Sequence, residues 1–416
     1  MAQRLSSNFA NALPIPCLCT LPFASIREES GTSTGNDYPL VLVHGLTGWG
    51  REEMAGINYW GGIKDVERNL NETGHITYTA TVGPVSSNYD RAVELFYYIK
   101  GGTVDYGAAH AKKYGHERYG RTYAGIFRQW DAKHKIHLIG HSMGGQTART
   151  LVELLKNGSK AEREHHREHP EDGLSPLFEG GKEWVHSVST IGTPHNGSTF
   201  ADEERLAPLM QEMILRAASL IGANTETLVY DYKLDHWGLR RKLGESFLTY
   251  IERVYKSSVW DSKDISSHDL TTWGAAEINE WVKTHPDVYY FSYTGKATYK
   301  DPYTGRSIPR LSMNPLMRRS SIFIGSYKRN SPEPVIDETW WPNDGIVSVT
   351  SAQYPFGHPH KRYDGYPQKG IWNWVPVHNG WDHFDFIGIG SADNLGLKDL
   401  YRFYHDLATN LHTLPK

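Results

Sequence analysis

The fold is decided by the stretch Lys135-Ile136-His137-Leu138-Ile139-Gly140-His141-Ser142-Met143-Gly144. An aliphatic run that favours a β-strand leads here into the pattern G-x-S-x-G, and residues 146–156 follow with apolar side chains at helical spacing. Gly158 then provides a suitable helix C-cap. A strand, a tight turn and a helix in this order are typical of a nucleophile elbow, in which a strained serine needs small neighbours two residues away. The pattern therefore predicts a reactive serine at position 142.

Strand and helix patterns alternate on both sides of this turn. Residues 39–45 and 184–191 favour two further buried strands, and residues 90–100 and 274–283 favour helices between strands. Such alternation predicts an α/β fold with a mostly parallel central sheet and helices on both of its faces.

The composition limits the organisation and the partners of the chain. No linker rich in Pro, Gly or Ser divides its 416 residues, so we expect one large domain, residues 38–416, after an N-terminal extension, residues 1–37. A net charge of -3, from 44 Lys and Arg against 47 Asp and Glu, gives no general attraction to nucleic acid. No run of residues approaches the roughly 18 apolar residues of a transmembrane span. Cys17 and Cys19 are too close in sequence for an unstrained disulfide.

A reactive serine needs a histidine base, and the base needs a carboxylate that orients it. In α/β hydrolases with this elbow, both partners follow the serine in the chain, the acid first. Asp344 is our candidate acid, because it lies in the turn Asn343-Asp344-Gly345 before a strand-like run at 346–349. His383 is the candidate base. Asp382 is its neighbour in sequence, but adjacent side chains rarely orient one another.

Two backbone N–H groups are needed to stabilise the oxyanion that forms when a serine attacks an ester. We expect one from Met143, directly after the serine, and one from Leu46, in the loop after the first predicted strand. His44 and His141 lie beside these donors and are further candidate bases. We interpret both as structural residues that hold the backbone by hydrogen bonds.

Four longer motifs resemble those of one family of enzymes. They are HGLTGWGREEM at 44–54, YWGG at 59–62, GGTVDYGAAH at 101–110 and LDHWG at 234–238. From about residue 40 to its C-terminus the chain resembles bacterial lipase family I.5, the zinc-containing thermoalkalophilic and staphylococcal-type lipases. The resemblance implies an α/β-hydrolase fold and hydrolysis of triacylglycerols and other carboxylic esters, with the catalytic triad Ser142, Asp344 and His383. It also implies a secreted protein, and we expect its signal peptide to be absent from this sequence.

The resemblance further implies a structural zinc site, in a subregion formed by residues 88–120 and 231–240. The ligand positions of the family fall on two carboxylates and two imidazoles: Asp90, His110, His116 and Asp235. Four such side chains make a closed tetrahedral set, which suits structural zinc and loses affinity as the histidines are protonated. From the residues alone, Asp90 is an equally good helix N-cap, and the histidines do not have a standard zinc-finger spacing.

Two more features of the family are a calcium site and a lid. A structural calcium ion near the catalytic histidine would bind Asp385 and Asp393, although an aspartate at 393 is nearly as suited to capping a turn. Residues 201–223 carry apolar side chains on one helical face. They fit equally well a core-facing helix and a lid that covers the active site in water and turns toward lipid at an interface.

Three other functions are compatible with parts of this pattern. The same triad would serve a carboxylesterase or a polyester hydrolase, which differ from a lipase in their substrates. A binding protein on an inactive hydrolase fold would be expected to lack a triad or oxyanion group, and none is lacking here. A metallohydrolase would need an open position for water on the zinc. We therefore predict a triacylglycerol lipase that meets its substrate at a lipid–water interface, as a monomer or a weak dimer.

Overall fold

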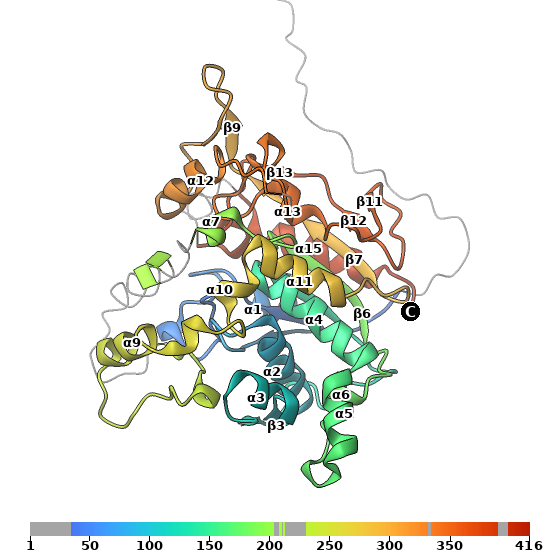
Figure 1. Ribbon diagram of the computed structural model, residues 1–416. Coiled ribbons are helices and arrows are strands. Elements are labelled where there is room, and N and C mark those ends of the chain that lie inside the picture. Colours follow the sequence, from blue (N-terminus) through green and yellow to red (C-terminus); the bar gives the residue numbers. More distant parts are fainter. Residues whose placement is uncertain (1–34, 204–207, 210, 213–229, 332–333, 390–397) are drawn as a thin grey trace, which may run out of the picture.

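A seven-stranded sheet forms the centre of the structure (Figure 1). The structure is a computed structural model that describes residues 35–203, 208–209, 211–212, 230–331, 334–389 and 398–416. All neighbouring strands of the sheet are parallel, which confirms the predicted α/β fold. From one edge to the other the strands are β11 (His360–Arg362), β12 (Trp372–Trp374), β7 (Tyr289–Tyr293), β6 (Val185–Ile191), β5 (Ile136–His141), β1 (Leu40–Val43) and β2 (Thr77–Ala80).

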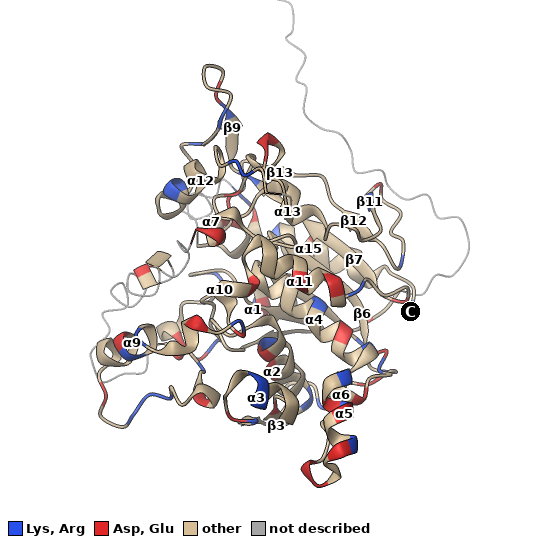
Figure 2. Cartoon of the chain, in the orientation of Figure 1, with Lys and Arg blue, Asp and Glu red and all other residues tan. Residues whose placement is uncertain are grey.

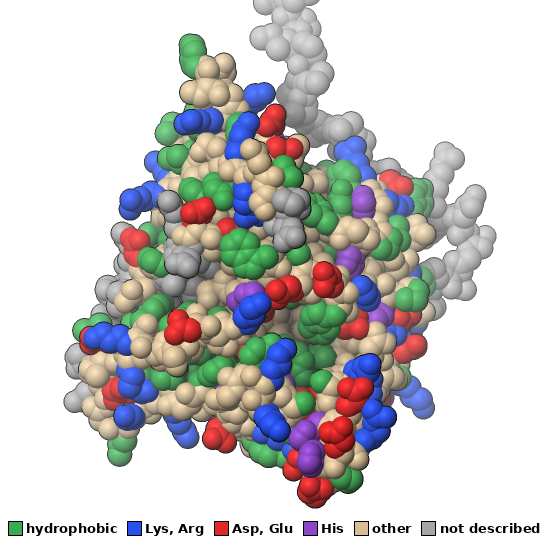
Figure 3. Space-filling model, in the orientation of Figure 1, with side chains coloured by type: hydrophobic (Ala, Val, Ile, Leu, Met, Phe, Trp, Pro, Cys, Tyr) green, Lys and Arg blue, Asp and Glu red, His purple; other side chains and the backbone are tan. Residues whose placement is uncertain are grey.

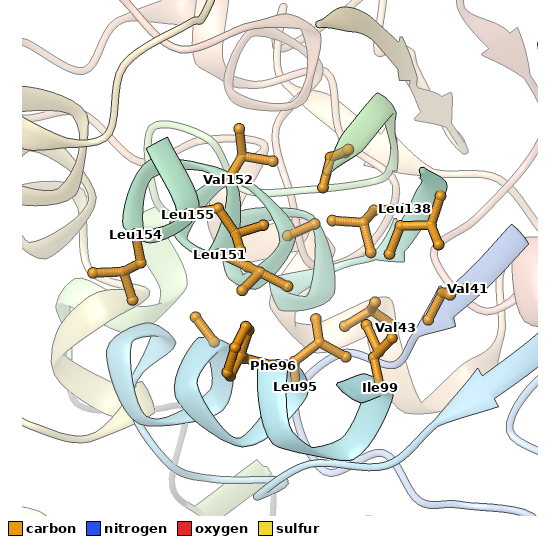
Figure 4. Close-up of a cluster of buried hydrophobic side chains, with 14 of the residues drawn as sticks. Val41, Val43, Leu95, Phe96, Ile99, Leu138, Leu151, Val152, Leu154 and Leu155 are labelled. Carbon is orange, nitrogen blue, oxygen red and sulfur yellow. The ribbon is translucent and has the colours of Figure 1, made fainter. Parts of the chain in front are cut away.

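Side chains of the central strands alternate between two apolar layers, one on each face of the sheet. On one face, the odd-numbered residues of β1 pack with helices α2 (Asn88–Lys100) and α4 (Met143–Asn157), as Figure 4 shows. On the other face, the even-numbered residues of β1 pack with α1 (Val66–Glu72) and α15 (Leu400–His412). The prediction of helices on both faces is therefore confirmed.

The predicted elements nearest the serine are present with small shifts of their ends. β5 and α4 enclose the G-x-S-x-G turn, and Gly158 is the C-cap of α4 as predicted. The helix predicted at 274–283 is α11 (Thr272–Trp281).

The strand predicted at 346–349 is wrong. Asn343 and Ser348 form one isolated bridge, and helix α13 (Val349–Gln353) begins directly afterwards. The physical reason is that the side chain of Asp344 accepts the backbone N–H groups of residues 346 and 347, which a strand would need for pairing.

The remaining elements surround the sheet. The helices are α3 (Ala108–Tyr114), α5 (Lys160–Glu168), α6 (Pro176–Glu179), α7 (Thr199–Asp202), α9 (Phe247–Tyr255), α10 (Ser266–Asp269) and α12 (Arg318–Ile324). Short 3-10 helices are η1 (Met54–Gly56), η2 (Pro170–Asp172), η3 (Asp235–Trp237), η4 (Ser258–Asp261), η5 (Pro315–Met317), η6 (Glu338–Trp340) and η7 (Asp385–Ile387). Three strand pairs are β3 (Gly102–Asp105) with β4 (Tyr119–Tyr123), β9 (Thr298–Lys300) with β10 (Ser307–Pro309), and β8 (Gly295–Lys296) with β13 (His378–Asn379).

Several predicted segments lie outside the described residues. Most of the candidate lid, residues 201–223, is among them, and so are residues 1–34. Asn36, two residues before the predicted start of the domain, is described and buried. Its side-chain amide donates to carbonyl oxygens of Leu411 and Leu414, at 2.8 and 3.0 Å, and so joins this end of the chain to α15.

The charged residues lie mainly on the helices and loops around the sheet (Figure 2), and the edge strand β11 carries Lys361 and Arg362. The four central strands β1, β5, β6 and β7 contain no Lys, Arg, Asp or Glu. On the face shown in Figure 3, acidic and basic side chains are interspersed. This distribution agrees with the near-neutral composition. Among the described residues, no helix combines the length and the apolar character that crossing a membrane requires.

Candidate active site

The turn between β5 and α4 holds Ser142 in a strained backbone conformation. Its φ is 55° and its ψ is -131°, values that residues with a side chain rarely adopt. A Cβ atom on Gly140 would lie 2.4 Å from the backbone of Gly144, and one on Gly144 would lie 2.1 Å from the carbonyl oxygen of Val43. Both distances are far below van der Waals contact. The turn therefore requires glycine at both positions, for the reason that the sequence suggested.

Asp344 and His383 lie together although 39 residues separate them. Asp344 Oδ2 is 2.7 Å from His383 Nδ1, and the backbone N–H of His383 donates to the carbonyl oxygen of Asp344 at 2.9 Å. Because a carboxylate only accepts hydrogen bonds, the proton of the neutral imidazole is on Nδ1, and Nε2 is free to take up another. A serine hydrolase needs this arrangement of its acid and base.

Ser142 is joined to this pair through neighbouring residues. His141 Nε2 is 2.9 Å from the carbonyl oxygen of His383, and the centroids of the two rings are 4.6 Å apart. The backbone N–H of Ser142 donates to the carbonyl oxygen of Ile191 at the end of β6. The structure thus brings the serine, the histidine and the aspartate to the carboxyl ends of the strands, where open α/β sheets place their sites. All three side chains are buried.

The groups that compete for these roles are engaged elsewhere. The carboxylate of Asp382 accepts three backbone N–H groups, and burial together with the charge of Asp385 raises the pKa of Asp382 to about 6. His44 and His141 are buried, and burial lowers the pKa of both imidazoles well below the usual value. They are neutral at neutral pH and bonded to the backbone, in agreement with the structural role that we expected.

Two backbone N–H groups remain free at the positions predicted for the oxyanion. Met143 is the first residue of α4, so its N–H has no partner within the helix. The N–H groups of Gly45 and Thr47 are both hydrogen-bonded. For the N–H of Leu46, which lies between them, the described part of the chain offers no partner.

The peptide unit that carries the Leu46 N–H is held from its other side. Its carbonyl oxygen, that of Gly45, is 2.9 Å from His44 Nδ1 and 3.5 Å from a guanidinium nitrogen of Arg91. His44 Nε2 accepts the N–H of Val82 at 3.1 Å, so the proton of the ring is on Nδ1 and this nitrogen donates. Because the N–H and C=O of one peptide point in opposite directions, these contacts turn the Leu46 N–H away from Arg91 and leave it for a ligand.

A second site brings together four side chains whose ligand atoms all lie within 4.8 Å of one another: Asp90, His110, His116 and Asp264. His110 Nε2 is 3.0 Å from an oxygen of each aspartate, and His116 Nε2 is 3.2 Å from Asp264. Ligand atoms around a tetrahedral zinc ion are about 3.3 Å apart. Only small shifts would be needed to enclose an ion, so this buried cluster could hold one metal.

Further hydrogen bonds orient the two carboxylates of this cluster. Ser87 Oγ accepts the N–H of Asp90 as the N-cap of α2, and it donates to Asp264 at 2.6 Å. His236 Nε2 is 2.9 Å from the second oxygen of Asp90. Burial would raise the pKa of Asp90, but hydrogen bonds from His110 and His236 hold it below its usual range. Burial acts to lower the pKa of His110, and the two aspartates outweigh it and raise that pKa to about 10.

Asp235, predicted as a ligand, does not belong to this cluster. Its carboxylate forms a bidentate ion pair with Arg121, at 2.8 and 2.9 Å. Asp264 is the second aspartate of the cluster instead, and the sequence interpretation missed it. Asp264 follows His116 by 148 residues and lies in the polar segment Asp261-Ser262-Lys263-Asp264, so no local pattern marks it as a ligand.

Asp385, one of the two residues predicted for calcium, is already engaged by other groups. Asp385 is buried, but its Oδ2 atom accepts the backbone N–H of Asp382 and pairs with the ammonium group of Lys398. Its Oδ1 atom has no hydrogen-bond partner within the described residues, and Asp393 lies outside them. Calcium takes six to eight oxygen ligands. One free oxygen of Asp385 beside a lysine falls far short of such a set, so Asp385 does not support the predicted calcium site.

Comparison with known proteins agrees with this geometry. The family model described as "Lipase-like, C-terminal domain" matches residues 36–415. Lipase 1 of Staphylococcus aureus strain MRSA252 is 39% identical over 422 residues, which cover 97% of this chain and 60% of that protein. A lipase of Staphylococcus epidermidis is 42% identical over 381 residues, which cover 90% of this chain and 54% of that protein. The chain thus spans little more than half the length of these curated relatives.

Solved structures of similar proteins match nearly the whole chain. EstA from Clostridium botulinum is 47% identical with a TM-score of 0.86, and the match covers 92% of this chain and 89% of that one. Lipase 1 from Pelosinus fermentans is 46% identical with a TM-score of 0.82, covering 91% and 99%. Staphylococcus hyicus lipase is 40% identical with a TM-score of 0.78, covering 93% and 98%. With its elbow, its buried histidine–aspartate pair and these relatives, the chain belongs to the staphylococcal-type family of bacterial lipases.

Proposed function

We propose that the protein is a lipase of the α/β-hydrolase fold that hydrolyses triacylglycerols, with Ser142 as nucleophile, His383 as base and Asp344 as the acid that orients it. The observation that carries this proposal is the 2.7 Å contact between Asp344 and His383 at the sheet edge where the strained Ser142 lies. The free N–H groups of Leu46 and Met143 support it, and so does the similarity to proteins named lipases.

The geometry suggests how these groups would act on an ester. Nε2 of His383 takes the Ser142 proton as Oγ attacks the carbonyl carbon, and the oxyanion accepts hydrogen bonds from Leu46 and Met143. The imidazolium then protonates the departing alcohol, which leaves an acyl group on Ser142. A water molecule, deprotonated by His383, then attacks the acyl carbon, and the imidazolium returns this proton to Ser142 Oγ as the bond to the acyl group breaks and the fatty acid leaves.

A buried apolar cluster beside the serine supports a lipid substrate. Met143 belongs to a buried cluster formed mainly by aromatic and aliphatic side chains, among them Phe200 and Tyr230. Leu209, which lies in the candidate lid, is half-buried against the same cluster. We propose that the enzyme binds its substrate at a lipid–water interface. The lid at residues 201–223 stays a prediction, because most of these residues lie outside the described part of the chain. Secretion remains a prediction.

The proposed function is tested by comparing an emulsified long-chain triglyceride with a soluble short-chain ester as substrates for the purified protein. We expect hydrolysis of both, because the proposed triad supplies the chemistry and similar proteins are named lipases. Activity on the short ester alone would make the protein a carboxylesterase. Activity on neither would contradict the proposal and favour an inactive hydrolase fold.

We also propose that the cluster of Asp90, His110, His116 and Asp264 binds a structural zinc ion. Imidazole and carboxylate are suitable zinc ligands, and four protein ligands would leave no position for a catalytic water. This completeness argues against a metallohydrolase. Bound zinc would tie α2, α3 and His116 just after α3 to the loop of Asp264, in place of direct contacts between the ligands.

Removal of one ligand is expected to release the metal and to weaken the fold. For His110→Ala and for Asp264→Asn, we expect loss of bound zinc and a melting temperature lower by about 5–10 °C, because an uncompensated buried charge remains. Asp235→Asn is the control and should retain its zinc, since Asp235 pairs with Arg121. Metal content is measured by mass spectrometry of the purified proteins. Loss of zinc from Asp235→Asn but not from Asp264→Asn would overturn this assignment.

A further inference from the structure

A buried chain of polar contacts connects the two halves of the active site. The backbone N–H of Gly45, in the loop that carries the Leu46 donor, donates to the hydroxyl oxygen of Tyr59 at 2.9 Å. That hydroxyl is 2.6 Å from His141 Nδ1, and His141 Nε2 is 2.9 Å from the backbone carbonyl oxygen of His383. Tyr59 and His141 are both buried.

The backbone groups at the two ends, the N–H of Gly45 and the carbonyl oxygen of His383, determine the direction of every hydrogen bond between them. A carbonyl oxygen only accepts, so His141 Nε2 carries a proton and donates it to His383. Nδ1 of the neutral His141 ring is then an acceptor, so the Tyr59 hydroxyl donates to it. The oxygen of Tyr59 meanwhile accepts the N–H of Gly45, which is itself only a donor. Each group in this series of hydrogen bonds can therefore act only as the donor or acceptor described, and the direction of each bond determines that of the next.

We propose that Tyr59 and His141 are positioning residues that couple the oxyanion loop to the catalytic histidine. The proposal rests on the function proposed above. Tyr59 is the central group, because its single hydroxyl contacts the loop on one side and His141 on the other.

Hydrogen bonds hold His383 from two sides. Its backbone N–H donates to Asp344, and its ring Nδ1 donates to the carboxylate of the same residue. The His141 contact at the carbonyl is therefore the hydrogen bond that holds His383 from the side of the nucleophile turn. Because His141 precedes Ser142 directly, it sets the backbone of the base relative to that of the nucleophile.

The Gly45 contact has a comparable effect on the oxyanion loop. Tyr59 fixes the peptide before Gly45, while His44 and Arg91 hold the next peptide, which carries the Leu46 N–H. The ring of Tyr59 also lies against Trp49 at 5.4 Å between centroids. Loss of its hydroxyl would leave the ring in place but free both the loop and His141 to shift, and catalytic geometry tolerates little displacement.

The test is Tyr59→Phe, with Tyr290→Phe as a matched control. The hydroxyl of Tyr290 also accepts one backbone N–H in the core, that of His285 at 3.0 Å, and its ring packs on Trp372. For Tyr59→Phe we expect kcat on a soluble ester to fall about tenfold with KM changed less than about twofold, the size of one lost hydrogen bond. Tyr290→Phe should lower the melting temperature by about as much as Tyr59→Phe does, and it should leave kcat unchanged.

A double-mutant cycle tests the coupling itself. If Tyr59 acts through His141, Tyr59→Phe should cost little further activity in a His141→Leu background, whereas independent effects would multiply. His141→Gln replaces His141→Leu in the cycle if the leucine variant does not fold. An unchanged kcat for Tyr59→Phe, or multiplying effects, would overturn the proposal. Lack of Ser142-dependent activity in the parent protein would instead contradict the proposed function, so the two failures are distinguishable.

Discussion

Ser142→Ala is expected to lower kcat for ester hydrolysis by about a million-fold, to the level that binding and the oxyanion donors alone provide. The substitution removes the single atom that would form the acyl-enzyme. It leaves the fold intact, because alanine keeps the Cβ atom and the same strained φ of 55° at this position. The measurements are steady-state hydrolysis of a short ester and the melting temperature.

Two controls separate loss of chemistry from loss of structure in this variant. The melting temperature and the zinc content of Ser142→Ala should equal those of the parent, since the metal cluster contains no residue of the turn. A phosphonate ester that labels reactive serines should modify the parent at Ser142 and should not modify the variant. Activity of Ser142→Ala within tenfold of the parent would rule out the proposed mechanism.

Asp344→Asn is expected to lower kcat by about ten-thousand-fold with little change in KM. In the parent protein, the Asp344 carboxylate accepts a hydrogen bond from His383 Nδ1 at 2.7 Å, which leaves Nε2 free to act as a base. An amide that presents its NH2 group there would favour the other tautomer, in which Nε2 carries the proton and cannot act as a base. The amide oxygen can still accept the N–H groups of residues 346 and 347, so the turn should persist.

Asp382→Asn is the matched control for this prediction. Asp382 is adjacent to His383 in sequence and equally buried, but its carboxylate accepts backbone N–H groups and does not contact the imidazole. We expect it to lower stability, with kcat reduced less than about tenfold. If Asp382→Asn were the more damaging of the two for kcat, Asp382 would be the orienting acid.

Sequence patterns predicted those parts of the structure that depend on neighbouring residues. The aliphatic run before Gly140 and the helical spacing after Gly144 predicted β5, the turn and α4, because strand and helix formation depend on side chains a few positions apart. Asp344 and His383 were proposed as acid and base from their order after the serine and from their turn-forming neighbours, and the structure brings the two side chains within 2.7 Å. The same local reasoning failed at residues 346–349, where a side chain of the turn took the backbone N–H groups that a strand needs.

The candidate metal site shows what motif matching could not predict. Asp90, His110 and His116 lie close together in sequence, in α2, in α3 and just after α3, and the resemblance to the family identified them. The motif that contains Asp235 lies beside the cluster, because His236 contacts Asp90. Asp235 itself pairs with Arg121, and neither residue is one of the four. Asp264 lies on a separate loop, and its approach to the other ligands follows from how that loop packs against the start of α2.

Local sequence patterns were therefore enough to predict the α/β architecture and the strained serine turn, and to select the acid and the base that we propose. These features depend on the spacing of side chains a few residues apart and on the two glycines that the turn requires. The tertiary structure was needed to show that Asp264 is the second aspartate of the candidate metal site. It was also needed to show that Lys398 pairs with Asp385 and that Tyr59 contacts both the oxyanion loop and His141. These are contacts between distant segments, and a buried polar group takes whichever partner the packing of the whole chain brings within hydrogen-bond distance.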